Sequence, residues 1–334
     1  MIENRNDCLF FAINISDLLK KELSEKFNFP FSEMKLINFP DGEIFAQPKL
    51  SVRGKKVFIF HSLSSPVNEN FMKLLIIIDA CKRSSAREIN LIIPYLAYSR
   101  QDRKTEERAA ITSKLVSDLI SNSGASRITT LDLHSDQIEG FFRIPIDHLY
   151  SIHLFAEYFL NNYRDKIEDF VIVSPDFGAA KKARTLSNLL SIPIVIMEKI
   201  RSKEGDIQEQ HVYGQVNFKN CLIFDDIIGT GGTVIKAARR LKELGAKSVI
   251  IGATHGLFSG KAETIFREAY VEKIFEKIVV TDCVPLVQNV SFVEVISISK
   301  LLAQVVNIYV KGVGSISEIY SNWTSELNQK LSLI

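Results

Sequence analysis

The stretch Cys221-Leu-Ile-Phe-Asp-Asp-Ile-Ile-Gly-Thr-Gly-Gly-Thr233 joins an apolar run, two adjacent carboxylates and a glycine-threonine turn. The run from Cys221 to Phe224 is typical of a parallel strand that is buried on both faces, and Asp225 and Asp226 stand where this strand is expected to end. Ligands bind at that end of the strands in open α/β sheets. The stretch therefore predicts a parallel sheet with a binding site at its edge.

The glycine-threonine turn is expected to lie at a helix N-terminus, because Val234 to Leu244 carries apolar residues at helical spacing. Free N–H groups and the helix dipole make such an end a site for phosphate. A nucleotide P-loop has a lysine just before its final Ser or Thr, whereas this chain has Gly232. The carboxylate pair could instead accept hydrogen bonds from the 2- and 3-hydroxyls of a ribose whose 5-phosphate meets the amides. The alternative is an ordinary βα turn with one Asp capping the helix.

Strand-like apolar runs alternate with helix-period segments along all 334 residues, which predicts an α/β protein of two domains with mainly parallel sheets flanked by helices. The expected domains cover 1–148 and 149–300, with Ile144 to His148 as the crossing point and a C-terminal helix within about 300–334 packing back on the first domain. The expected strands are 8–13, 57–63, 89–95, 128–132, 170–174, 194–197, 221–225, 248–253, 277–281 and 293–298, and the expected helices are 17–27, 69–83, 111–122, 179–190, 234–244, 261–268 and one near 303–310.

The bulk composition argues against polyanionic partners, since 41 Lys and Arg nearly balance 39 Asp and Glu. Met1 to Asp7 lacks the basic and apolar regions of a signal peptide, and no apolar run reaches the ~20 residues of a membrane span. We therefore expect a cytoplasmic protein that binds neither nucleic acid nor membrane. The four cysteines are scattered without metal-ligand spacing, and we expect them to be small core residues.

Two further segments combine residue types that suit a nucleotide. Phe39-Pro-Asp-Gly-Glu43 predicts a hairpin turn at Asp41 and Gly42, and it adds an aromatic ring and two acids that could stack on a base and accept from its amino group. Tyr98-Ser-Arg-Gln-Asp-Arg-Lys104 follows an expected strand, and its cations could contact a polyphosphate while Gln101 reads a base edge. A plain hairpin and a solvated loop are the respective alternatives.

Candidate metal and loop residues follow other strands. His134 and Asp176 each come directly after an apolar strand, and Mg²⁺ prefers oxygen ligands, so Asp176 is the natural candidate and His134 could act through a water. Lys199 and Arg201 occupy alternate positions, so in an extended chain both point to one side. The polar run Glu204 to Gln210 beyond them is expected to be mobile, which would let these cations close over a phosphate, although a solvated hairpin is the alternative.

Taken in order, these segments resemble the class I ribose-phosphate diphosphokinases, also called phosphoribosyl pyrophosphate (PRPP) synthases. The similarity spans nearly the whole chain, and the joint order of the motifs is far more specific than any one of them. The matching segments are Phe39-Pro-Asp-Gly-Glu43, Ser51-Val-Arg-Gly54, Arg100-Gln-Asp-Arg-Lys104, Leu131-Asp-Leu-His134, Gln137-Ile-Glu-Gly-Phe-Phe142, Val173-Ser-Pro-Asp176, Lys199 with Arg201, Asp225 to Thr233, and Thr254-His-Gly256.

The resemblance implies two phosphoribosyltransferase-like domains and Mg²⁺-dependent transfer of the diphosphoryl group of ATP to O1 of ribose 5-phosphate, giving PRPP and AMP. It also implies a homo-oligomer built from dimers, with a hexamer as one possibility, in which a neighbouring subunit completes the ATP site. The implied residues are Lys199 and Arg201 for catalysis; Phe39, Asp41, Gly42, Glu43, Arg100 and Gln101 for ATP; Arg201, Asp225, Asp226, Gly229, Thr230, Gly231, Gly232 and Thr233 for ribose 5-phosphate; and His134 and Asp176 for the metal.

The chain departs from the family pattern at three places. Gly229 replaces an acid of the usual phosphate loop; because backbone N–H groups bind the phosphate, we expect function to survive, with ribose 5-phosphate affinity as the property that could change. Thr105-Glu-Glu107 replaces basic residues that help form an inhibitory nucleotide site in regulated members, and Phe177 is bulkier than the usual residue. Two other functions stay open on the sequence: a non-catalytic regulatory homologue that binds nucleotide and synthase subunits, and a phosphoribosyltransferase that consumes PRPP. The second does not account for the segments at Phe39 and Arg100.

Overall fold

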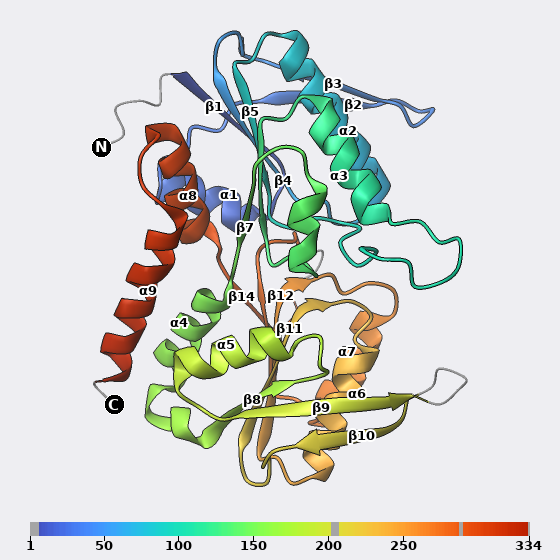
Figure 1. Cartoon of the computed structure of the whole chain (residues 1–334), viewed down its shortest axis with the longest axis vertical. Coiled ribbons are helices and arrows are strands. Elements are labelled where there is room, and N and C mark those ends of the chain that lie inside the picture. Colours follow the sequence, from blue (N-terminus) through green and yellow to red (C-terminus); the bar gives the residue numbers. More distant parts are fainter. Residues whose placement is uncertain (1–6, 202–206, 287–289, 333–334) are drawn as a thin grey trace. The chain divides into compact units, whose positions relative to one another are not determined.

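The computed structural model describes residues 7–201, 207–286 and 290–332, and within these ranges it leaves the side chains of residues 199–201 and 207–210 undescribed. The chain divides into two compact units (Figure 1). The N-terminal unit comprises Met1–Tyr150, Asp282–Pro285 and Ser297–Gly314, and the C-terminal unit comprises Ser151–Thr281, Leu286–Ile296 and Ser315–Ile334.

The N-terminal unit contains a five-stranded parallel sheet in the order β1-β4-β5-β6-β7, and a separate antiparallel hairpin of β2 and β3. Its strands are β1 (Cys8–Asn14), β2 (Met34–Asn38), β3 (Ile44–Pro48), β4 (Lys56–His61), β5 (Glu88–Ile93), β6 (Arg127–Leu131) and β7 (Ile146–Leu149), and its helices are α1 (Asp17–Glu25), α2 (Val67–Arg83), α3 (Thr112–Ser123), the 3-10 helix η2 (Asp136–Phe141) and α8 (Ser299–Lys311).

The C-terminal unit contains a seven-stranded sheet in the order β10-β9-β8-β11-β12-β13-β14, in which only the β9–β10 pair is antiparallel. Its strands are β8 (Phe170–Ser174), β9 (Ile194–Arg201), β10 (Ile207–Tyr213), β11 (Asn220–Ile228), β12 (Ser248–Gly256), β13 (Lys277–Thr281) and β14 (Val293–Ile296), and its helices are α4 (Ile152–Tyr163), the 3-10 helix η3 (Arg164–Asp169), α5 (Ala180–Leu190), α6 (Gly232–Glu243), α7 (Ala262–Val271) and α9 (Ile316–Leu331).

The predicted fold class is confirmed, but several elements differ from the expectation. Ile144 to His148, expected as a crossing point, largely belongs to β7, which pairs with β6. The C-terminal segment forms two helices rather than one, because α8 ends at Gly312 in a left-handed conformation with φ 69°. Helix α8 falls in the N-terminal unit and α9 in the C-terminal unit. Helix α4 and strand β10 were not predicted: α4 is mainly apolar and β10 is mainly polar, so neither showed a clear amphipathic pattern.

The central strands of both sheets are buried on their two faces, as the apolar runs predicted. In the N-terminal unit, Phe10 of β1 stacks on Phe58 of β4 with ring centroids 5.1 Å apart. All four cysteines of the chain are buried free thiols, as expected. Among the residues that the structure describes, no helix is long and apolar enough to cross a membrane.

Candidate active site

The paired carboxylates lie within β11 near its C-terminal end. The strand was expected to end at Asp225, but its pairing with β12 continues to Ile228, whereas its pairing with β8 runs only from Asn220 to Ile223. Asp225 and Asp226 therefore extend past the part of β11 that β8 covers. This geometry keeps the carboxyl groups at the carboxyl edge of the sheet even though the strand is longer than predicted.

The two carboxyl groups are electrostatically different. The Asp225 carboxylate accepts a hydrogen bond from the Asp226 backbone N–H at 2.8 Å, and desolvation together with the neighbouring Asp226 raises the pKa of Asp225 well above its usual value. Asp226 is 7% exposed, and its Oδ2 lies 3.8 Å from the Lys182 Nζ of α5. A proton or a cationic ligand on Asp225 would lower the repulsion within the pair.

The turn after β11 delivers uncapped amide groups beside these carboxylates. Gly231 is the N-cap of α6 with φ 83°, and as a glycine it has no side chain to cap this helix. The first N–H groups of a helix have no partner within the helix, so they are available to an anion. The Gly229 carbonyl is engaged by the Ser259 N–H at 3.1 Å, which ties the turn to the segment after β12. The predicted turn at a helix N-terminus is confirmed, and its binding of phosphate stays a prediction.

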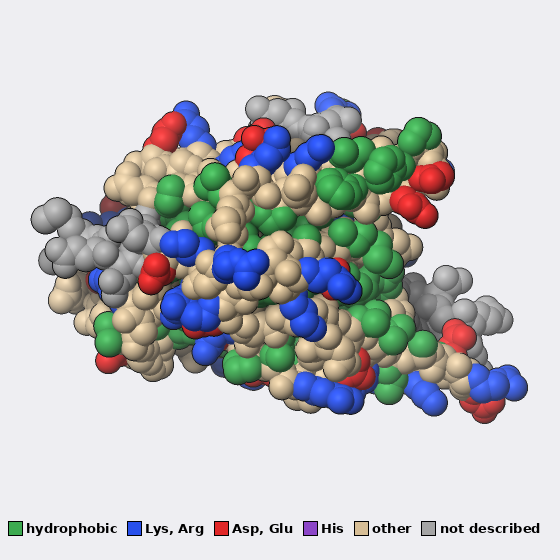
Figure 2. Space-filling view, turned by 90° about the horizontal axis from the view of Figure 1, so that it is seen from above, with side chains coloured by type: hydrophobic (Ala, Val, Ile, Leu, Met, Phe, Trp, Pro, Cys, Tyr) green, Lys and Arg blue, Asp and Glu red, His purple; other side chains and the backbone are tan. Residues whose placement is uncertain are grey.

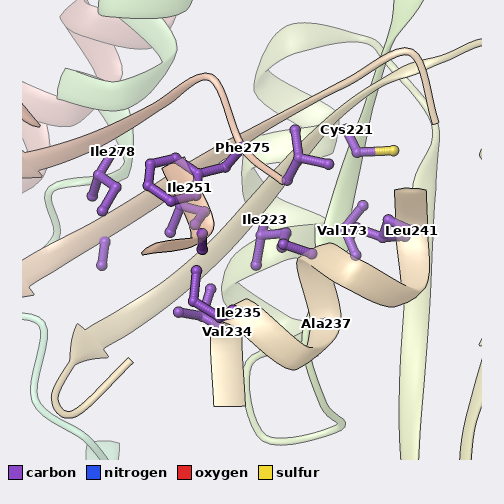
Figure 3. Close-up of a cluster of buried hydrophobic side chains, with 14 of the residues drawn as sticks. Val173, Cys221, Ile223, Val234, Ile235, Ala237, Leu241, Ile251, Phe275 and Ile278 are labelled. Carbon is purple, nitrogen blue, oxygen red and sulfur yellow. The ribbon is translucent and has the colours of Figure 1, made fainter. Parts of the chain in front are cut away.

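A buried apolar cluster holds this turn in place (Figure 3). Val234, Ile235 and Leu241 of α6 pack with Ile223 of β11 and Ile251 of β12 in one hydrophobic core. Burying a Val, Leu or Ile side chain contributes about 1.5–3 kcal/mol each, so the cluster fixes the start of α6 relative to the sheet.

Close packing also explains Gly231. A Cβ at this position would lie 2.6 Å from the Phe266 ring of α7, and its positive φ disfavours any L side chain. By contrast, a Cβ at Gly232 would meet nothing within 4 Å. Close packing therefore requires glycine at position 231 but not at position 232.

Asp176 follows β8, the strand next to β11. Its Oδ1 accepts from the Ala179 N–H at 3.1 Å, and its negative charge contributes to raising the pKa of Asp225. The neighbouring Phe177 is 60% exposed. Asp176, Asp225 and Asp226 thus place three carboxyl groups at the carboxyl ends of two adjacent strands, and carboxylate oxygens are the donors that Mg²⁺ prefers.

Lys199 and Arg201 lie at alternate positions near the end of β9, on the other side of β8. Their backbone positions pair with Gln210 and Ile207 of β10. Of the run expected to be mobile, residues 204–206 lie outside the described residues, and Ile207 to Gln210 belong to β10, in agreement with the hairpin alternative for that part.

The Phe39 segment forms the turn of the β2–β3 hairpin, as predicted. The turn is closed by hydrogen bonds from the Phe39 N–H to the Glu43 carbonyl at 2.8 Å and from the Glu43 N–H to the Asp41 carboxylate at 3.1 Å. Gly42 has φ 92°. Phe39 is 43% exposed, and both acids are exposed, so all three side chains are accessible to a ligand.

Arg100, Gln101 and His134 follow β5 and β6, which are neighbours in the N-terminal sheet. The Gln101 side-chain oxygen accepts from the Thr112 hydroxyl at 2.7 Å, and its carbonyl accepts from the Ser113 N–H at 3.1 Å, which anchors this loop to the start of α3. Arg100 and His134 are both exposed. The N-terminal unit therefore presents its candidate residues on separate loops.

The predicted residues fall into two groups by unit. The C-terminal unit brings together Asp176, Asp225, Asp226 and the turn 229–233, while the N-terminal unit carries the hairpin, Arg100, Gln101 and His134. The sequence analysis missed Lys182, which is paired with Asp226; its position six residues after Asp176 at the start of α5 was the only available signal.

Two family models match the chain, each within one part of it. The N-terminal domain of ribose phosphate pyrophosphokinase matches residues 8–124, and the phosphoribosyl transferase domain matches residues 147–288. Together the two matches cover most of the chain in the order that the motifs predicted.

Curated relatives and a solved structure agree with these models. The chain is 38% identical to a ribose-phosphate pyrophosphokinase of Ureaplasma parvum serovar 3 and 41% identical to one of Mycoplasma genitalium, in each case over 96% of both chains. It superposes on the crystal structure of phosphoribosylpyrophosphate synthetase from Mycobacterium smegmatis with a TM-score of 0.84 and 36% identity, covering 92% of this chain and 100% of that one.

Proposed function

Because the chain belongs to the ribose-phosphate pyrophosphokinase family, we propose that it transfers the diphosphoryl group of ATP to O1 of ribose 5-phosphate, releasing AMP and forming PRPP. The observation that carries the proposal is the junction of Asp225 and Asp226 with the uncapped N-terminus of α6. Carboxylates are acceptor-only groups that suit ribose hydroxyls, and free helix amides suit the 5-phosphate.

Ribose 5-phosphate would bind the C-terminal unit through this junction. Asp225 and Asp226 would accept from the 2- and 3-hydroxyls, and residues 229–233 would bind the phosphate mainly through backbone N–H groups. Since those groups need no side chain, binding survives the loss of an acid at Gly229. Lys182 Nζ, 3.8 Å from Asp226 Oδ2, would help to hold the Asp226 carboxylate in place beside these hydroxyls.

The proposed metal is Mg²⁺, and the donor chemistry of Asp176 fits it. The carboxylate of Asp176 lies in the acidic surroundings of Asp225 in the C-terminal unit. His134 is a separate candidate in the N-terminal unit, where it would hold a metal through a water. When bound, the ion would neutralise the ATP oxygens and polarise the β-phosphorus.

Transfer would proceed by in-line attack of O1 on the β-phosphorus. The new O1–Pβ bond forms as the bond from Pβ to the oxygen bridging to the α-phosphorus breaks; AMP leaves with that oxygen, and the proton of the O1 hydroxyl passes to solvent. Lys199 and Arg201, at alternate positions of β9, would stabilise the negative charge that spreads over the phosphoryl oxygens. No covalent enzyme intermediate is needed in this scheme.

ATP would bind the N-terminal unit through Arg100 and Gln101, with Phe39, Asp41, Gly42 and Glu43 reaching it from a neighbouring subunit. The proposed homo-oligomer is supported by exposed apolar side chains on the N-terminal unit: Leu115 of α3 is 57% exposed and Met72 of α2 is 51% exposed. Figure 2 shows hydrophobic side chains gathered into contiguous areas on the surface seen from above. Exposed apolar areas of this kind mark association surfaces.

The test is direct incubation of the purified protein with ATP, Mg²⁺ and ribose 5-phosphate. The expected products are PRPP and AMP in equal amounts, measured by ³¹P NMR at several phosphate concentrations. Binding of both substrates without either product would favour the regulatory homologue, and consumption of added PRPP with a free base would favour a phosphoribosyltransferase.

Adding ADP to the same assay tests whether Thr105-Glu-Glu107 abolishes nucleotide inhibition. The cytoplasmic location stays a prediction, testable by fractionation.

A further inference from the structure

The segment after β6 is attached to β7 at two consecutive backbone amides. The Asp132 N–H donates to the Leu149 carbonyl at 2.8 Å, and the Leu133 N–H donates to Nε2 of His148 at 2.9 Å. Asp132 has a positive φ of 38°, so the chain turns sharply where these bonds form. The next residue is His134, the proposed metal-binding residue of this unit.

Both nitrogens of the His148 ring have a partner. The side chain is 1% exposed, its Nδ1 lies 2.7 Å from the Glu139 Oε1 of η2, and its ring lies 4.4 Å from the Tyr150 ring. Since Nε2 accepts the Leu133 N–H, it carries no proton, and the proton of the neutral ring is on Nδ1, which donates it to Glu139. The tautomer of His148 is therefore fixed by its two partners.

The same residues could be taken for a cation site, because the ligand atoms of Asp136, Glu139 and His148 lie within 4.8 Å of one another. A cation on Nδ1 would require the neutral ring to carry its proton on Nε2. That proton would point at the Leu133 N–H, and two donors would face each other in a buried place. The hydrogen-bond geometry thus favours a chain of hydrogen bonds from Leu133 through His148 to Glu139 over a metal site.

We infer that His148, oriented by Glu139, is a positioning residue for His134. The ring accepts the N–H of Leu133, the residue before His134. It thereby fixes the direction in which the His134 side chain leaves the backbone. This inference rests on the metal-binding role proposed for His134. Removing a group that orients a metal ligand without touching the metal commonly lowers metal affinity about 10–100-fold.

The test compares His148→Leu with His148→Gln in the full-length protein. Leucine keeps apolar bulk but removes the acceptor, whereas the glutamine side-chain oxygen can reach the place of Nε2. We expect His148→Leu to speed hydrogen exchange of the Leu133 amide at least about tenfold and to raise the Mg²⁺ concentration for half-maximal activity about tenfold, with the KM for ribose 5-phosphate unchanged. His148→Gln should restore both quantities to near wild-type values.

Glu139→Leu is the second variant, since the Glu139 side chain is 41% exposed and the change leaves the buried ring of His148 in place. It should raise the Mg²⁺ requirement in the same direction, whereas Glu318→Leu, a matched exposed change on α9, should not. Faster exchange at Leu133 with an unchanged Mg²⁺ requirement in both variants would overturn the inference.

His134→Ala separates this failure from failure of the proposed function. If His134→Ala leaves the Mg²⁺ requirement unchanged, the metal role of His134 is wrong, and the positioning role falls with it. If His134→Ala raises the requirement while His148→Leu and Glu139→Leu do not, only the positioning role is overturned.

Discussion

The two units carry their candidate chemistry in different ways. In the C-terminal unit, one continuous stretch from Asp225 to Thr233 supplies carboxylates, a tight turn and a helix N-terminus. In the N-terminal unit, the candidate residues come from the β2–β3 hairpin, the loop after β5 and the loop after β6. The difference teaches that a phosphate-binding turn is a local structure, whereas a nucleotide site can be assembled from separate loops only by the fold.

Buried carboxyl groups sharpen the same comparison. Asp225 lies at the candidate site, and its raised pKa comes first from desolvation and then from Asp226. Asp282 of the N-terminal unit is 2% exposed and away from the predicted residues; desolvation raises its pKa to about 7, and its Oδ1 accepts from the Ile298 N–H at 2.8 Å. A raised pKa therefore marks a candidate site only where the group also reaches a sheet edge with other polar groups.

The largest expected effect is on turnover. Lys199→Ala should lower kcat by several orders of magnitude with little change in the binding of ribose 5-phosphate, because a cation at the transferring phosphoryl group acts mainly in the transition state. Steady-state kinetics and calorimetric titration of ribose 5-phosphate measure the two quantities. An equal loss of binding would instead place Lys199 in the ground-state site of the C-terminal unit.

A reciprocal pair of substitutions tests the division of substrates between the units. Asp226→Asn should raise the KM for ribose 5-phosphate about 10–100-fold, and Arg100→Ala should do the same for ATP, since a hydrogen bond to a charged group contributes about 1.5–3 kcal/mol. Each variant should leave the KM for the other substrate nearly unchanged. Both constants are measured by initial rates.

Controls for this pair are Asp165→Asn in η3 and Arg87→Ala in the N-terminal unit, which change exposed charges outside the candidate sites. Both should behave as the wild type. If Asp226→Asn and Arg100→Ala each raised both KM values equally, the assignment of one substrate to each unit would be wrong.

The adjacent glycines of the turn give a matched test of local geometry. Gly231→Ala should lower the free energy of unfolding by about 1–3 kcal/mol, because its φ is 83° and its Cβ would collide with Phe266. Gly232→Ala, with open space around the Cβ, should leave stability unchanged or raise it by up to about 1 kcal/mol. Urea denaturation measures both, and equal losses would contradict the close-packing explanation.

The smallest effect concerns pH. Because burial raises the pKa of Asp282 from 3.8 to about 7 in the folded state, its contribution to stability is present in full below pH 3.8 and is lost as pH rises through about 7. Between pH 6 and 8 the loss should be about 1 kcal/mol relative to Asp282→Asn, which keeps the acceptor for the Ile298 N–H. Urea denaturation of both proteins at each pH cancels the contributions of other groups, including nearby Glu22. A difference that does not change with pH would show that Asp282 is charged throughout.

Much of the fold was predictable because apolar patterning reports burial directly. The strands Phe170–Ser174 and Lys277–Thr281 were predicted with the bounds that the structure gives. The extension of β11 to Ile228 was not, since Asp225 and Asp226 interrupt the apolar run and only pairing with β12 continues the strand. Likewise β10 carries polar residues on an edge strand, where hydrophobic pattern is weakest.

By itself, the sequence determined the fold class, the glycine-threonine turn at the start of a helix and the family, because each depends on residue types at fixed spacing along the chain. Only the tertiary structure decided that Lys182 meets Asp226, that Phe266 lies under Gly231, and that His148 holds the amide before His134. Each of these contacts joins residues from different strands, helices or loops. Their distance along the sequence depends on how the chain connects the elements, so a local sequence pattern does not predict which of them meet.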